Sequence, residues 1–103
     1  MTPEQRYNCL TEMSTYTDRD AYVSDLAFSS IWEDAPEGDI PQERLEQLSR
    51  LWDAVHIPIK ALLSPLTPTQ ASRLYCIPVR TLENWYAEIR TCPVYVRLYL
   101  SGV

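Results

Sequence analysis

Three polar side chains between residues 80 and 84 have complementary hydrogen-bonding chemistry. Arg80, Glu83 and Asn84 follow the i, i+3, i+4 spacing that places side chains on one face of a helix. In the major groove an arginine can pair bidentately with guanine and an asparagine with adenine, and a glutamate can accept from the amino group of cytosine. Val79 lies beside them near the start of the same segment. These four residues therefore form a candidate base-contacting surface.

The segment before and around these residues has the spacing of two short helices joined by a tight turn. In the stretch TPTQASRLYCIPVRTLENW, from Thr67 to Trp85, Ser72 is the small residue where the helices would approach, and Cys76 would form the turn. Apolar residues fall where they would pack the two helices on each other and on the rest of the domain: Ala71, Tyr75, Ile77, Leu82 and Trp85. The spacing predicts a helix-turn-helix unit whose second helix spans about residues 78–88.

Other polar residues flank this second helix in positions that suit a DNA backbone. Thr69, Gln70 and Arg73 lie on the preceding helix, and Arg90 lies just past the second one. In the usual docking of a helix-turn-helix unit, residues at such positions contact phosphates and fix the orientation of the protein on the duplex. We expect the same of these four residues.

The run CIPVRTLENWYAEIRTCPVYVRLYL resembles small regulators of the Cro/repressor-type (XRE-like) helix-turn-helix family, especially compact ones from Gram-positive bacteria and mobile elements. Their pattern near the turn is close to G-I-P-x-R-T-x-x-x-W-x-x-G-x-R-x-x-P-x-Y-V. The chain matches it at Ile77, Pro78, Arg80, Thr81, Trp85, Arg90, Pro93, Tyr95 and Val96. The resemblance extends from His56 onward and implies sequence-specific binding to double-stranded DNA.

The chain departs from this pattern at three positions. Cys76 replaces the glycine of the turn, and Glu88 replaces the glycine after the second helix. Both residues must then adopt a positive φ, which non-glycine residues tolerate less well, or the local geometry must differ. Pro68 stands where a phosphate-contacting glutamine is common, with Gln70 two positions away. DNA binding is weakened or lost if these positions change the docking surface.

Charge divides the chain into two parts of opposite sign. The formal net charge is -5, but residues 1–65 hold 12 acidic and 5 basic side chains, whereas residues 66–103 hold 2 and 4. The positive part coincides with the helix-turn-helix segment, as DNA binding requires. The acidic run with Glu33, Asp34, Glu37 and Asp39 predicts a solvated loop. The alternative is that these carboxylates mimic the phosphates of DNA.

The remaining pattern predicts a small all-α fold, with acidic N-terminal helices packed on a C-terminal helix-turn-helix bundle. We expect one helix from Pro3 to about Tyr16 after a Thr2 cap, and a second after Asp18 with Tyr22, Leu26, Ile31 and Trp32 on its apolar face. A third helix starts at Ile40-Pro41 and bends near His56. Four short helices then fill residues 57–101, starting near Pro58, Thr67, Pro78 and Pro93.

We divide the chain into an acidic helical region, residues 1–55, and a helix-turn-helix region, residues 56–103, within one continuous body. No apolar run is long enough to span a bilayer, and the N-terminus lacks the pattern of a signal peptide, so we expect a cytoplasmic protein without membrane association. Cys9, Cys76 and Cys92 are an odd number and far apart, which favours free, buried thiols.

The sequence contains no pattern of residues that predicts catalysis or metal binding. His56 is the only histidine and has no cysteine near it in the sequence, so it predicts neither a metal site nor a Ser-His-Asp triad. We therefore expect a protein that is not an enzyme and needs no cofactor.

Two hypotheses remain. The first is a transcriptional regulator that binds DNA as a homodimer, with the C-terminal residues Tyr95, Leu98 and Tyr99, and Tyr86 nearby, as interface material. The second is a protein-binding module with a degenerate helix-turn-helix. Its acidic N-terminal half would engage a basic partner, as a phage-derived inhibitor of a nucleic-acid enzyme of host defence (anti-CRISPR-like) does. Clustered, unpaired arginines in the C-terminal part favour the first.

Overall fold

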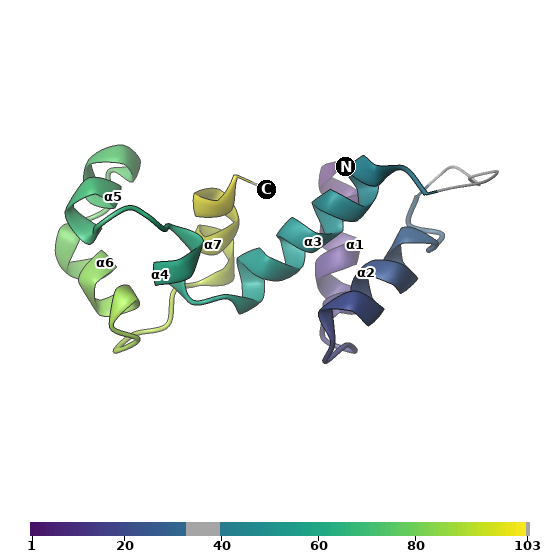
Figure 1. The fold of residues 1–103 in the computed structure, drawn as a ribbon, viewed down its shortest axis with the longest axis horizontal. Coiled ribbons are helices and arrows are strands. Elements are labelled where there is room, and N and C mark those ends of the chain that lie inside the picture. Colours follow the sequence, from purple (N-terminus) through teal and green to yellow (C-terminus); the bar gives the residue numbers. More distant parts are fainter. Residues whose placement is uncertain (33–39, 103) are drawn as a thin grey trace. The chain divides into compact units, whose positions relative to one another are not determined.

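The computed structural model describes residues 1–32 and 40–102, and the regular structure in these ranges is entirely helical (Figure 1). The described helices are α1 (Pro3–Met13), α2 (Arg19–Ala27), α3 (Gln42–His56), α4 (Ile59–Leu62), α5 (Pro68–Tyr75), α6 (Val79–Tyr86) and α7 (Val94–Ser101). The all-α prediction is confirmed. The chain forms two compact units, Met1–Trp52 and Asp53–Val103, so α3 begins in the first unit and its last turn belongs to the second.

The helices of the first unit begin where the capping residues predict. Thr2 accepts a hydrogen bond from the backbone N–H of Gln5 (3.1 Å), and the Gln5 side chain accepts one from the N–H of Thr2 (2.8 Å). Asp18 accepts one from the N–H of Ala21 (3.0 Å) at the start of α2. Each cap satisfies N–H groups that have no partner inside the helix, which fixes the first residue of the helix.

The second helix is shorter than its apolar spacing predicts. α2 ends at Ala27, so Ile31 and Trp32 lie beyond it, in a turn. The backbone N–H of Ser29 and the indole N–H of Trp32 both donate to the carbonyl oxygen of Leu26 (3.2 and 2.8 Å), which closes the helix and folds Trp32 back onto it. The acidic run Glu33–Asp39 lies outside the described residues.

The core of the first unit combines aromatic with aliphatic side chains: Tyr22, Trp32 and Trp52 are buried together with Met13, Leu26, Leu48 and Leu51. Tyr22 is fully buried, donates from its hydroxyl to the carbonyl oxygen of Cys9 (2.9 Å), and has its ring centroid 5.2 Å from that of Trp52. Arg44 of α3 is also buried; it donates to the carbonyl oxygen of Ala27 (3.2 Å) and lies over the ring of Trp32 (4.4 Å). The arginine thus closes the C-terminal end of α2 and covers the tryptophan.

An aliphatic core holds the second unit together. Its buried residues are Ile59, Leu63, Ala71, Leu82, Cys92 and Leu100. Partly buried residues pack around it, and they include Tyr75, Ile77 and Trp85, which the helix-turn-helix spacing predicted for this role. Pro58, Pro78 and Pro93 each precede the first residue of a helix, as predicted, because a proline there loses no helical hydrogen bond.

Candidate nucleic-acid interface

The first helix of the candidate interface, α5, begins at a capping box. Thr67 accepts from the N–H of Gln70 (3.2 Å), and the side-chain oxygen of Gln70 accepts from the N–H of Thr67 (2.9 Å). The predicted phosphate contact Gln70 thus uses its amide oxygen to fix the helix start. Its amide nitrogen is not part of this box and keeps its N–H donors. Thr69 is exposed in the same first turn.

The turn between α5 and α6 is held by one serine. The carbonyl oxygen of Ser72 accepts from the N–H of Cys76 (2.9 Å), and its hydroxyl donates to the carbonyl oxygen of Ile77 (2.6 Å). Cys76 has φ 57° and ψ 37°, the left-handed conformation expected of a residue that replaces the turn glycine. Cys76 is exposed, which corrects the expectation of a buried thiol there; Cys9 and Cys92 are buried as predicted.

The second helix, α6, ends earlier than predicted. It spans Val79–Tyr86 rather than about 78–88, because Glu88 has φ 57° and its N–H bonds back to the carbonyl oxygen of Trp85 (3.1 Å). The carbonyl oxygen of Asn84 accepts a hydrogen bond from the N–H of Ile89 (2.9 Å), and this bond completes the C-terminal cap, in which Glu88 is the residue with left-handed backbone. Both positions where the family pattern has glycine therefore keep the glycine-like backbone with another residue.

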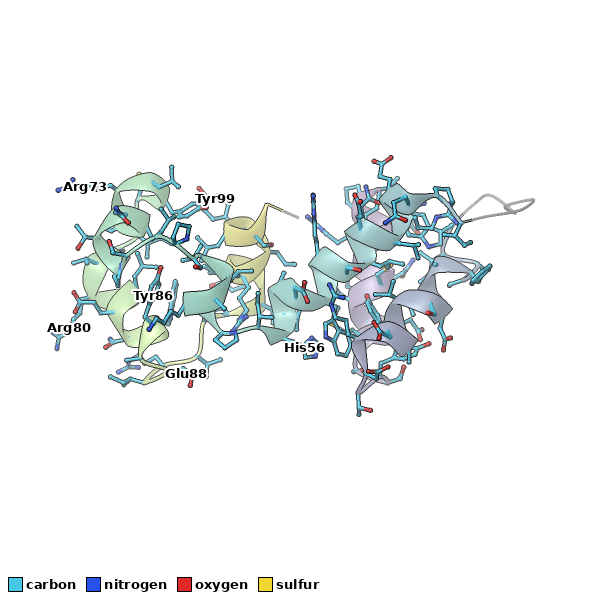
Figure 2. All side chains as sticks on the ribbon, in the orientation of Figure 1. His56, Arg73, Arg80, Tyr86, Glu88 and Tyr99 are labelled. Carbon is cyan, nitrogen blue, oxygen red and sulfur yellow. The ribbon has the colours of Figure 1, made fainter. Side chains whose placement is uncertain are left out.

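Arg73 of α5 and Arg80 of α6 are exposed, and their side chains extend from the same side of the helix pair (Figure 2). In the described ranges, 1–32 and 40–102, neither arginine forms an ion pair with Glu83 or Glu88. The packing beneath them is fixed, since Leu82 and Ala71 are fully buried between the helices. Within the part of the chain that the structure describes, these two guanidinium groups have no carboxylate partner, and the helices that carry them pack on a buried core.

The other predicted residues divide between this surface and two neighbouring sites. Val79 is exposed at the start of α6, and Asn84 is half-buried near its end. Glu83 lines an open groove of about 540 Å³ with Lys60 and Thr67. Arg90 lines a different cavity, next to Trp85. Of the eight predicted contact residues, Glu83 and Arg90 therefore have surroundings that the sequence pattern did not indicate.

Three side chains that the sequence pattern did not predict as hydrogen-bond donors connect distant segments of the second unit. The hydroxyl of Tyr86 donates to the carbonyl oxygen of Leu66 (2.9 Å), and that of Tyr75 donates to the carbonyl oxygen of Leu100 (3.4 Å). The Tyr86 side chain therefore points into the second unit. It does not extend the exposed surface of Tyr95 and Tyr99 on α7. Burial raises the pKa of the Tyr86 hydroxyl above its ordinary value.

Arg97 of α7 is the third of these residues. Its Nη1 donates to the carbonyl oxygens of Ala54 (3.1 Å) and Ile57 (2.6 Å), at the C-terminal end of α3. The signal in the sequence is a single cation in the apolar run VYVRLYL, since a charge in such a run needs a partner.

No family model, curated protein or solved structure matches the chain. No group of three or more potential metal ligands occurs among the described residues. Within the same residues, no helix has the length and apolar character needed to cross a bilayer.

Proposed function

We propose that the protein is a sequence-specific DNA-binding transcriptional regulator that places α6 in the major groove. The observation that carries this proposal is the pair of exposed arginines, Arg73 and Arg80, on one side of the packed α5–α6 pair, with neither guanidinium paired to Glu83 or Glu88. Guanidinium groups that no carboxylate neutralises can pair with phosphates and with guanine. The resemblance to Cro/repressor-type regulators supports the same function.

In this proposal Arg80 and Asn84 contact base edges from α6, with Val79 at the helix start. Glu83 contacts bases only if it turns away from the groove that it lines with Lys60. Thr69, Arg73, Arg90 and the amide nitrogen of Gln70 contact phosphates, which orient the helix but do not select a sequence.

We further propose that two copies bind a two-fold operator, with their α6 helices about 34 Å apart, the distance of one turn of DNA. The outer face of α7 supports this pairing: Tyr95 and Tyr99 are 75% and 64% exposed. The helix has one charged residue, Arg97, and that side chain is bonded to the end of α3. A face without charge can meet its own copy without repulsion.

Selection from random duplex DNA at two salt concentrations tests the DNA-binding proposal. We expect a two-fold motif to be enriched and the affinity to fall as salt rises, because bound cations on the DNA are released. Arg80→Ala should cost about 1–3 kcal/mol of binding free energy and relax the preference at one base pair.

Arg50→Ala is the matched control for this variant. It removes an exposed arginine from α3 in the first unit and changes the net charge by the same amount. Equal binding of all operator variants by wild type and Arg80→Ala would remove Arg80 from the base-contacting surface. Absence of any binding at low salt would reject the DNA-binding function.

The exposed aromatic residues of the first unit favour a second candidate, a module that binds a basic protein. Tyr7 and Phe28 are 69% and 72% exposed in a unit whose described carboxylates all lie at the surface. A basic partner such as a nucleic-acid enzyme would complement this charge. A pull-down in which Phe28→Ser loses the partner, while Arg80→Ala keeps it, would support this candidate over the first.

A further inference from the structure

A cavity of about 230 Å³ lies in the second unit, beside the end of α6. Its walls come from α4, from the last turn of α6, from the connection that follows it and from α7. The lining residues are Ile59, Trp85, Glu88, Arg90, Thr91, Cys92 and Arg97. Figure 2 shows Glu88 on the connection that leaves α6, apart from Arg73. The cavity is therefore separate from the α5 side of the proposed DNA surface.

Arg97 gives this cavity a fixed cation. Its Nη1 is bonded to the carbonyl oxygens of Ala54 and Ile57, so the guanidinium plane is already ordered. A guanidinium has five N–H donors on three nitrogens. In the part of the chain that the structure describes, no hydrogen bond occupies Nη2 or Nε of Arg97. An anion that enters the cavity can therefore accept hydrogen bonds from a side chain that the fold has already ordered, so that binding costs less conformational entropy.

The charges around the cavity leave an excess of one positive charge. Arg90 and Arg97 contribute two cations, and Glu88 contributes one carboxylate. No ion pair joins Glu88 to either arginine within residues 1–32 and 40–102. Ile59 and Trp85 add apolar surface to the wall of the cavity. Thr91 adds a hydroxyl that can donate to the same anion.

We propose that this cavity binds a small free oxyanion of the phosphate class, held between the guanidinium groups of Arg90 and Arg97. A cavity of about 230 Å³ has room for inorganic phosphate or a small phosphorylated molecule. Paired arginines suit such a ligand, because their N–H groups match two oxygens at once. The buried walls formed by Ile59 and Cys92 favour a small molecule over the backbone of a duplex.

Arg90 is also one of the proposed contacts to DNA phosphates, so the test uses no DNA. Titration of the full-length protein with inorganic phosphate tests the proposal, and its result does not depend on the proposed DNA binding. Backbone and indole NMR signals report the binding, with sodium chloride at matched ionic strength as the reference. We expect saturable shifts at Thr91, Cys92, Arg97 and the Trp85 indole. Shifts that do not saturate, or that chloride reproduces, would mean general screening and would overturn the proposal.

Three variants at exposed positions sharpen the test without touching the core. Arg90→Ala should weaken phosphate binding about tenfold or more, as expected from the loss of a charge-assisted hydrogen bond. Glu88→Gln should tighten it, because it removes the carboxylate that opposes the anion. Arg50→Ala, which removes an exposed arginine of α3 outside the cavity, should leave it unchanged. Equal affinity of Arg90→Ala and wild type would overturn the site.

Discussion

The two units of the chain reach stable helix packing by different means. The first unit buries aromatic side chains whose polar atoms bond to backbone carbonyls, as Tyr22 does to Cys9 and Trp32 to Leu26. The second buries aliphatic residues, and its tyrosines Tyr75 and Tyr86 reach from the rim of the core to carbonyls of distant segments. An aliphatic core with hydrogen bonds at its rim leaves the outer faces of α5 and α6 available for recognition.

The two units also have one structural feature in common. In each, an arginine from a later helix closes the C-terminal end of an earlier one: Arg44 bonds to Ala27 at the end of α2, and Arg97 bonds to Ala54 and Ile57 at the end of α3. Cations are favourable at this end of a helix because its last carbonyls lack partners. These two arginines therefore contribute to the stability of the fold.

The strongest test of the division into two units removes one core leucine from each. Leu82→Ala and Leu48→Ala delete fully buried side chains, and each should cost about 2–5 kcal/mol of stability. We expect hydrogen exchange to rise in α5–α7 for Leu82→Ala and in α1–α2 for Leu48→Ala. The same exchange pattern in both variants would show that the chain unfolds as one body instead.

Alkaline pH should weaken the first unit. Burial raises the pKa of Cys9 from its ordinary 9.0 to about 11, and burial likewise raises that of Tyr22. Because the folded state holds these protons more tightly, the contribution of Cys9 to stability is complete below about pH 9 and is lost as the pH rises from 9 to 11. The contribution of Tyr22, whose ordinary pKa is 10.0, starts to fall only above about pH 10. Thermal unfolding followed by circular dichroism over this range measures the loss.

Tyr22→Phe separates the two groups in that experiment. It removes the phenol, so the decline above about pH 10 should become shallower, although the variant also loses the hydrogen bond to Cys9. Tyr7→Phe, at an exposed tyrosine of α1, is the control and should keep the wild-type profile. Identical profiles for wild type and Tyr22→Phe would contradict the assignment to Tyr22.

The smallest expected effect concerns the left-handed residues of the second unit. Cys76→Gly should stabilise the protein by about 0.5–1 kcal/mol, because glycine adopts φ 57° without steric cost. Ala87→Gly, at a neighbouring residue with φ −83°, is the control and should be neutral or destabilising. A melting temperature that falls for Cys76→Gly would mean that the thiol side chain makes a favourable contact which outweighs the strain.

Most of the helix starts could be predicted from residues close to them in the sequence. Caps at Thr2, Asp18 and Thr67, and prolines before α4, α6 and α7, fix helix starts through bonds within a few residues, so the sequence indicates them directly. The predicted end of α2 was wrong. Trp32 has the sequence spacing of a helical residue, but it lies beyond the helix, and its indole N–H donates back to the carbonyl oxygen of Leu26. The sequence left two alternatives at Cys76 and Glu88, a positive φ or a different local geometry, and both residues have a positive φ.

The surroundings of the candidate site residues were harder to predict. The position of Arg80 follows from the helix period alone, so the sequence places it on an exposed face. Arg90 lines a cavity with walls from α4 and α7, and Glu83 lines a groove with walls from α4 and from residues 64–68. Such walls depend on packing between segments distant in the sequence. The contacts of Arg44 and Arg97 span 17 and up to 43 residues, beyond any local signal.

The exposed thiol at the turn makes the protein suited to site-specific labelling without mutagenesis. Cys76 is exposed three residues before α6 begins, whereas Cys9 and Cys92 are buried and burial raises the pKa of both thiols. Because the thiolate is the reactive form, a maleimide dye at neutral pH should attach at Cys76 first. A fluorophore there sits beside the helix that we propose enters the groove, so its emission can report DNA binding by the otherwise native chain.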